Sequence, residues 1–104
     1  LMAFTLLAAP GCRKSLEVSR CIQAKINEVA TNPASIIVRV DEYVFKGQTV
    51  YLFADSPEIA DCGATVYDRD CNQLCFLGGI AGLVDCQGLR FGDHAVFKRT
   101  LWSR

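Results

Sequence analysis

Residues 35–53 read SIIVRVDEYVFKGQTVYLF, and this stretch decides the fold class. It is rich in β-branched and aromatic residues, which favour strands over helix. The run is interrupted by Lys46-Gly47-Gln48, three residues typical of a tight turn. The stretch therefore predicts an antiparallel hairpin with strands over residues 35–45 and 49–53.

A second hairpin is predicted immediately downstream. Its strands cover residues 64–67 and 73–77, and the sequence DRDCN at 68–72 supplies the turn between them. The segment 55–63 contains Pro57 and Gly63 and is predicted to be a loop.

The last part of the chain begins with a glycine-rich segment. Residues 78–93 contain five glycines and show little periodicity, so we expect an ordered loop. Its order would come from Cys86 and from four apolar side chains: Ile80, Leu83, Leu89 and Phe91. Residues 94–102, from His94 to Trp102, are predicted to form an edge strand.

An amphipathic helix is predicted before the first hairpin, over residues 16–31. The apolar residues Val18, Ile22, Ile26 and Val29 recur at steps of three and four, which places them on one helix face. Asn32-Pro33 ends the helix, because a proline disfavours the helical conformation in the residue before it.

Charge and cysteine content indicate where the chain resides. Eleven acidic residues balance eleven basic ones over 104 residues, which argues against nucleic acid as a partner because phosphate binding needs a basic excess. Six cysteines in so short a chain are typical of an oxidising compartment, where disulfides reinforce small cores.

The first ten residues, LMAFTLLAAP, are apolar and uncharged. They are too few to span a bilayer but match the hydrophobic region of an export signal, here without a basic start. The following Gly11-Cys12 resembles the end of a bacterial lipobox, so we predict lipidation of Cys12. An ordinary signal peptide, or a buried strand with Cys12 in a disulfide, are the alternatives.

These elements combine into one α+β domain. We expect an N-terminal amphipathic helix packed on an antiparallel sheet of four to five strands, braced by disulfides. The predicted boundaries are a truncated signal peptide over residues 1–11, a tether over 12–15 and a single α+β domain over 16–104.

Several spacings in the chain form one pattern: Tyr43-x3-Gly47-x2-Val50-Tyr51, Asp61-Cys62, Val66-Tyr67-Asp68-x2-Cys71-Asn72-x2-Cys75, Gly78-Gly79-Ile80-Ala81-Gly82, Cys86 and Leu101-Trp102. This pattern resembles that of a family of uncharacterised Bacteroidota lipoproteins. The resemblance covers nearly all of the chain after the leader and implies export and this fold, with no assigned activity.

Lipidation of Cys12 would leave five cysteines as disulfide candidates: Cys21, Cys62, Cys71, Cys75 and Cys86. Two bridges and one free thiol can then be drawn in about fifteen ways, among which sequence does not choose. Our preferred pairing joins Cys21 to Cys86, and Cys62 to Cys75 or Cys71. A Cys71–Cys75 bridge is disfavoured because residues four apart on one extended strand lie too far apart.

The sequence predicts no metal or phosphate site. Cys71, Cys75, Cys86 and His94 have a loose spacing for zinc, and disulfides explain the sulfurs better. Asp68, Asp70 and Asn72 match half of a calcium loop but also suit a plain turn. No helical pattern follows the glycines at 78–82, as a phosphate cradle would need. We expect no cofactor.

We expect no catalytic residues either. His94 is the single histidine, and a Cys-His pair would need a free thiolate. Cys71 and Cys75 lack the Cys-x-x-Cys spacing of thiol-redox proteins. The aromatic residues of the hairpins are expected in the core rather than in a ligand cleft.

Two functions remain as hypotheses. The first is a non-enzymatic cell-envelope lipoprotein, anchored by its lipid and facing the periplasm or the cell surface, that acts as a binding or structural module. Its partners would be the membrane and another envelope protein. The second is a small disulfide-braced inhibitor of a secreted hydrolase, presenting the loop at 54–62 or at 78–86.

Overall fold

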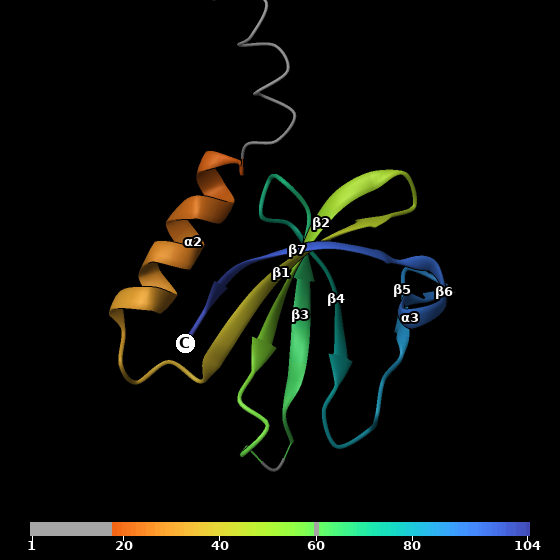
Figure 1. Ribbon diagram of the computed structural model, residues 1–104. Helices are drawn as coiled ribbons and strands as arrows, with labels where there is room; N and C mark the ends of the chain where they lie inside the picture. Colours follow the sequence, from red (N-terminus) through yellow and green to blue (C-terminus); the bar gives the residue numbers. More distant parts are fainter. Residues whose placement is uncertain (1–17, 60) are drawn as a thin grey trace, which may run out of the picture.

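The computed structural model describes residues 18–59 and 61–104. The predicted signal peptide, the tether and Cys12 lie outside this range. One helix lies beside a twisted antiparallel sheet, as predicted (Figure 1). No helix among the described residues is both long and apolar enough to cross a membrane.

The helix, α2, spans Arg20–Thr31 and begins later than predicted. Ser19 is its N-cap, and the Ser19 hydroxyl accepts a hydrogen bond of 3.2 Å from the Ile22 amide. A serine in this role stands outside the helix, which explains why Val18 is not helical despite its apolar spacing. Asn32 is the C-cap, and its amide donates to the carbonyl oxygen of Val29.

Five strands form the main sheet, which confirms the predicted fold class. Their order is β4-β3-β2-β1-β7, so both predicted hairpins form and the last strand pairs at the edge with β1. The strands are β1 (Ile37–Phe45), β2 (Gln48–Asp55), β3 (Gly63–Tyr67), β4 (Gln73–Gly78) and β7 (Val96–Ser103).

The central strand, β2, is buried on both faces. Val50, Leu52 and Ala54 belong to one core cluster, whereas Tyr51 and Phe53 belong to another. This alternation follows from the two-residue period of a strand. The sheet therefore separates two cores, each closed by a different part of the chain.

One core lies on the side that we call the helix face. Ile22 and Ile26 of α2 pack there against Val40, Tyr51 and Phe53. Burying each isoleucine contributes about 2 kcal/mol, and these two are the buried residues of the helix.

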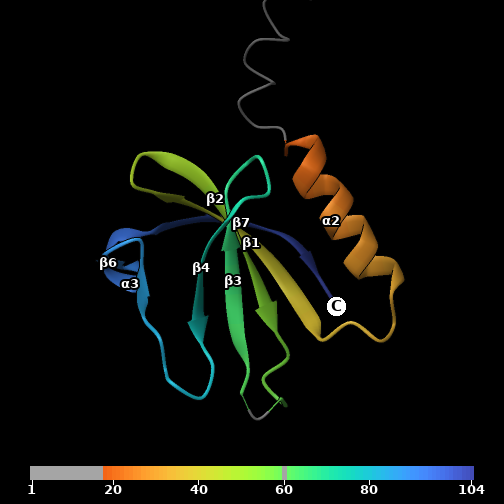
Figure 2. The same cartoon turned by 180° about the vertical axis from the view of Figure 1, so that it is seen from behind.

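The other core lies on what we call the β5–α3 face. It is covered by a small ladder of β5 (Asp85–Cys86) and β6 (Leu89–Arg90), followed by the short helix α3 (Phe91–His94) (Figure 2). The Phe91 ring lies 5.0 Å from that of Phe45, measured between centroids.

The final segments differ from the prediction in detail. Residues 78–93 are ordered as expected but contain these short elements, and His94 ends α3 instead of opening the last strand. Leu89 and Phe91 pack into the core, as expected. Ile80 and Leu83 do not, since 89% and 50% of their surfaces are exposed.

Two segments cover the faces of the sheet: α2 on the helix face and the β5–α3 segment on the other, and we call them the two covers. Each cover is attached to the β3–β4 hairpin by one disulfide. Cys21 pairs with Cys71, and Cys75 pairs with Cys86, with Cα atoms 6.0 and 5.2 Å apart. Closing loops of 50 and 11 residues contributes about 4 and about 3 kcal/mol in the chain-entropy model.

The predicted pairing of Cys21 with Cys86, and of Cys62 with Cys75 or Cys71, is wrong. Cys21 belongs to the helix, whereas Cys86 is buried in the core on the opposite side of the sheet. The 68–72 turn, which carries Cys71, lies beside the start of α2, because the Ser19 hydroxyl donates to the carbonyl oxygen of Arg69 at 2.7 Å.

Candidate functional site

The cysteines considered as metal or redox groups are divided between the two disulfides. Cys71 and Cys75, the candidate redox pair of the sequence, have different partners: Cys71 is bonded to Cys21 and Cys75 to Cys86. His94 lies in α3, with its Nδ1 atom 3.1 Å from the carbonyl oxygen of Arg90. Residues 18–59 and 61–104 contain no cluster of three metal-ligating side chains.

The segment at 68–72, which matches half of a calcium loop, forms a turn whose backbone is held by the side chain of Asp68. The Oδ1 atom of Asp68 accepts hydrogen bonds from the amides of Asp70 and Asn72, at 2.8 and 2.9 Å. The Asn72 side chain donates to the other carboxylate oxygen at 3.1 Å. The bond from the Asn72 amide, above all, lowers the pKa of Asp68 from its usual value, because it favours the charged form.

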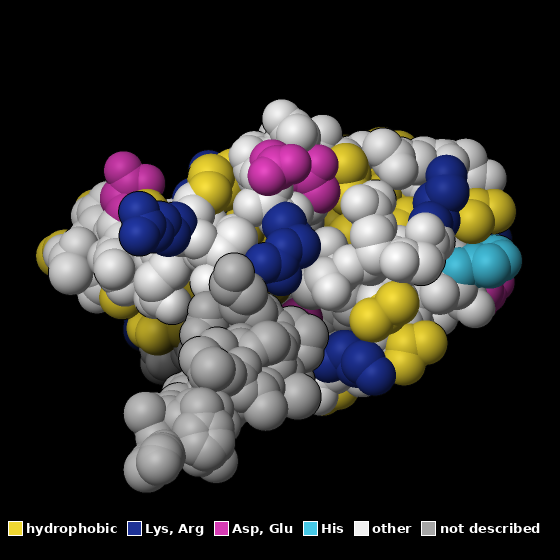
Figure 3. Space-filling view, turned by 90° about the horizontal axis from the view of Figure 1, so that it is seen from above, with side chains coloured by type: hydrophobic (Ala, Val, Ile, Leu, Met, Phe, Trp, Pro, Cys, Tyr) yellow, Lys and Arg dark blue, Asp and Glu magenta, His cyan; other side chains and the backbone are white. Residues whose placement is uncertain are grey.

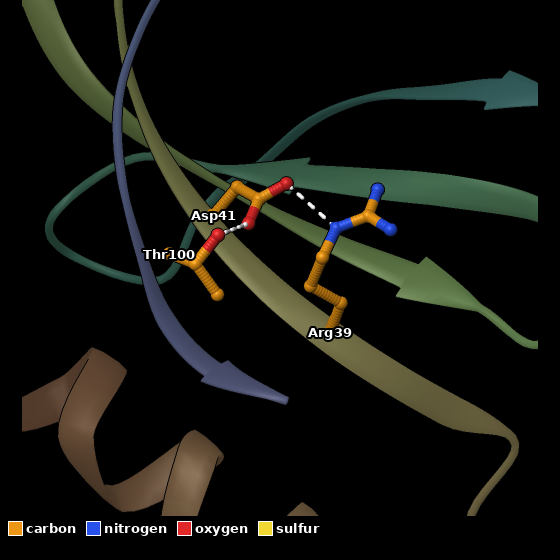
Figure 4. A network of polar contacts seen from close by, with 3 residues as sticks. All are labelled: Arg39, Asp41 and Thr100. Atoms are coloured by element: carbon orange, nitrogen blue, oxygen red, sulfur yellow. Dashed lines mark hydrogen bonds and ion pairs between the residues drawn. The ribbon is translucent and has the colours of Figure 1, made fainter. Parts of the chain in front are cut away.

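A buried polar cluster joins β7 to β1. Asp41 is 4% exposed, and its carboxylate accepts from Arg39 Nε at 2.8 Å and from the Thr100 hydroxyl at 2.7 Å (Figure 4). These bonds offset the cost of burying the carboxylate. The Arg99–Glu42 ion pair, at 3.0 Å, ties the same two strands on the neighbouring register position. Both pairs are therefore explained as attachments of the edge strand.

Tyr51 carries a polar atom that lacks a partner. Its side chain is fully buried on the helix face, and its hydroxyl is left without a close hydrogen-bond partner, with the Arg69 side chain the nearest candidate. Burial is the main cause that raises the pKa of Tyr51, while the positive charge of Arg69 lowers it.

A cleft opens between α2 and the sheet, with a volume of about 100 Å³. Ligand pockets for small molecules are typically roughly 300–1,000 Å³, so this cleft would hold one side chain or ring at most. The Lys25 ammonium lies at its edge, 4.4 Å from the centre of the Tyr67 ring. The lining residues are Lys25, Glu28, Val29, Ile37, Phe53, Thr65 and Tyr67.

The two loops that sequence offered as separate binding surfaces lie side by side. The Gly79 amide donates to the carbonyl oxygen of Cys62 at 2.9 Å, and Gly63 pairs with Gly78 where the two loops leave the sheet (Figure 1). The surface they form exposes Glu58, Asp61 and Ile80 and includes Leu83 and the unpaired, half-buried thiol Cys62. We call these five residues the loop end.

The loop end lies at the opposite end of the β3–β4 hairpin from the start of α2. Cys71, which is bonded to Cys21, stands in the turn at one end of the hairpin, and Gly63 and Gly78 stand at the other. Five residues of strand separate the ends by about 17 Å. Figures 1 and 2 both show α2 entering at the top and these loops at the bottom.

The two ends of the molecule also differ in charge. Seen from above, the end at which α2 begins shows basic and acidic side chains interspersed (Figure 3). The loops at 55–62 and 78–84 contain three carboxylates, Asp55, Glu58 and Asp61, and no lysine or arginine. The sequence named the two loops as alternatives, but nothing in it showed that they meet or that Ile80 points outward.

Comparison with known proteins places the chain in a family without adding an activity. No curated protein and no solved structure matches it. A family model does match, over residues 24–104, from the second turn of α2 to the last residue of the chain. The chain therefore belongs to the family described as a domain of unknown function, DUF6970.

Proposed function

We propose that the chain is a non-enzymatic cell-envelope lipoprotein that binds a partner through its loop end. A lipid on Cys12 would anchor the chain on the N-terminal side of α2. The observation that carries the proposal is the position of the loop end, at the far end of the hairpin from the first turn of α2. A domain held in this way presents the loop end away from the membrane.

The sequence supports the anchor. The apolar leader and the lipobox-like Gly11-Cys12 precede the domain, and the cysteine-rich chain suits an oxidising envelope. The resemblance to uncharacterised Bacteroidota lipoproteins points to the same location. A bacterial lipoprotein carries several acyl chains on its N-terminal cysteine. Stable attachment to a membrane requires more than one acyl chain, so this anchor would be stable.

The anchor is tested by an intact mass of the chain extracted from membranes, with free thiols alkylated before and after reduction. We expect an acylated N-terminal Cys12, two disulfides and one alkylated thiol at Cys62. Cys12→Ala should release the chain from the membrane fraction. Cys62→Ala is the matched control and should stay in that fraction. A wild-type chain without lipid would remove the anchor from the proposal.

The non-enzymatic part of the proposal rests on the sequence, in which we expect no catalytic residues. It would be overturned if the domain turned over a substrate and a single side-chain change abolished the turnover.

Inhibition of a secreted hydrolase is the second candidate. It is favoured by the loop at 78–84, which lies within the ring closed by the Cys75–Cys86 disulfide and carries an exposed apolar residue. A panel of proteases and lysozymes tests it, and no inhibition at micromolar protein would remove it.

A further inference from the structure

Ile80 is the most exposed large apolar side chain among the described residues, with 89% of its surface accessible. The isoleucines of α2, Ile22 and Ile26, are 0% and 5% exposed. Leu83, three residues along the same loop, is half exposed and extends the apolar surface. Interfaces commonly place such a side chain in a desolvated pocket of the partner.

The backbone that carries Ile80 is held in one conformation. Gly78 and Leu83 exchange two hydrogen bonds of 2.8 and 3.0 Å, and the Gly82 amide donates to the carbonyl oxygen of Gly79 at 3.1 Å. The Cys75–Cys86 disulfide closes the chain on either side of this turn. A loop ordered before binding loses less conformational entropy when it binds.

Gly78 and Gly79 are required where the turn meets the neighbouring loop. Both have positive φ angles, 86° and 73°, which side chains disfavour. A Cβ atom on Gly78 would lie 3.0 Å from the Cα atom of Gly63 and 3.2 Å from the carbonyl oxygen of Cys62. The glycines thus bring the acidic loop against the apolar turn.

The two loops that form the loop end, at 55–62 and 78–84, carry acidic side chains and no lysine or arginine. Glu58 and Asp61 are exposed, and neither makes an ion pair with the described residues. Negative groups beside an apolar contact favour a partner whose own contact is rimmed by lysine and arginine. They also disfavour a second copy of this chain docking through the same surface, because the carboxylates would face each other.

We propose that the loop end binds a basic protein surface, with Ile80 inserted into an apolar pocket that is rimmed by lysine and arginine side chains. This inference rests on the proposed binding function and adds the chemistry of the partner. Ile80 supplies the buried contact, while Glu58 and Asp61 accelerate association and select the charge of the partner.

The test is photo-crosslinking of the full chain in cells that produce it. Benzoylphenylalanine is placed at Ala81, beside Ile80, and the crosslinked protein is identified by mass spectrometry. We expect a crosslink from position 81 that disappears when Ile80→Asp is added. Gln48, the exposed first residue of β2 at the other end of the sheet, is the matched probe position and should give none.

The captured protein is then purified and titrated with the chain. Ile80→Asp should raise the dissociation constant about thirtyfold or more, the size typical of a central contact residue. Glu58→Lys with Asp61→Lys should raise it roughly tenfold, mainly through slower association. Lys98→Glu, on the edge strand, should leave it unchanged. The melting temperature of each variant is measured to show that it folds.

The outcomes separate this inference from the proposed function. An unchanged dissociation constant after the two charge reversals, or a partner surface that is not basic, overturns the inference. A crosslink from a probe at Thr65, in the cleft, with none from position 81, also overturns the inference about the loop end. In that case the chain would still be a binding module, with its site in the cleft. No crosslink from any of these positions overturns both.

Discussion

The two covers of the sheet are attached in different ways. The helix cover, α2, has 12 residues, its own N-cap and two buried residues. The β5–α3 cover consists of elements of two, two and four residues, too short to persist without the sheet. It contributes the fully buried Cys86 and the 5%-exposed Phe91 to the core. The α2 cover is therefore a local structure that only has to be attached to the sheet. The β5–α3 cover forms only when it packs on the sheet.

The largest loss of stability is expected when α2 is detached from the hairpin by removal of the Cys21–Cys71 disulfide. Cys21→Ala with Cys71→Ala should lower the free energy of unfolding by about 4 kcal/mol, because the bond closes a loop of 50 residues. Urea unfolding followed by circular dichroism measures this loss. Cys62→Ala is the control and should change it by less than about 0.5 kcal/mol. A loss smaller than that of the second disulfide would reverse the comparison.

Removing the Cys75–Cys86 disulfide should lower the free energy of unfolding by less than removing the Cys21–Cys71 disulfide does. It should nevertheless disorder more of the cover that it attaches. Cys75→Ala with Cys86→Ala should lower the free energy of unfolding by about 3 kcal/mol, for a loop of 11 residues. Hydrogen exchange should accelerate over residues 85–95 and stay slow in α2. Equal acceleration in both covers would contradict the distinction.

A smaller effect is expected at the start of α2. Ser19→Ala removes the cap to Ile22 and the bond to the carbonyl oxygen of Arg69, so we expect a loss of about 1 kcal/mol in thermal or urea unfolding. Ser19→Asp is the matched variant, since its carboxylate can cap the helix but has no hydrogen to donate to the carbonyl oxygen of Arg69. If both variants lose the same amount, the bond to Arg69, and not the cap, stabilises this end.

The smallest effect at neutral pH is expected for Tyr51→Phe. The buried hydroxyl has no close hydrogen-bond partner, so its removal should be neutral or stabilise by up to about 1 kcal/mol. A loss above about 1 kcal/mol would show that the hydroxyl is bonded in solution.

The same variant has an expected alkaline signature. Burial raises the pKa of Tyr51 above its ordinary value of 10.0. The unfolded chain therefore loses this proton at lower pH than the folded protein does. The contribution of this group to the free energy of unfolding is therefore fully present below pH 10 and is lost as the pH rises through the folded pKa. Urea unfolding between pH 9 and 11 should show a shallower decline for Tyr51→Phe.

The strands were predictable because their signals are local. The turn at Lys46-Gly47 and the β-branched runs beside it define the first hairpin without reference to the rest of the chain. The helix was predictable from its apolar spacing, whereas its first residue depended on whether Ser19 or an earlier residue supplied the cap.

The disulfide pairing and the loop end were not predictable in the same way. Both depend on which face of the sheet each segment covers, and that follows from contacts between residues far apart in the chain. Cys71 and Cys75 are four residues apart but serve opposite faces. Ile80 resembles a core residue in sequence, and only the hydrogen-bonded turn around it directs it outward.

The division of the cysteines between the two faces has a consequence for oxidative folding. Once the sheet has formed, it works as a partition: the thiols of Cys21 and Cys71 meet on one side, and those of Cys75 and Cys86 on the other. A chain that oxidises before the partition exists has many pairings open to it, whereas one that oxidises afterwards has one partner for each of these thiols. Correct maturation then depends on the relative timing of sheet formation and thiol oxidation, and not on selectivity of the oxidant.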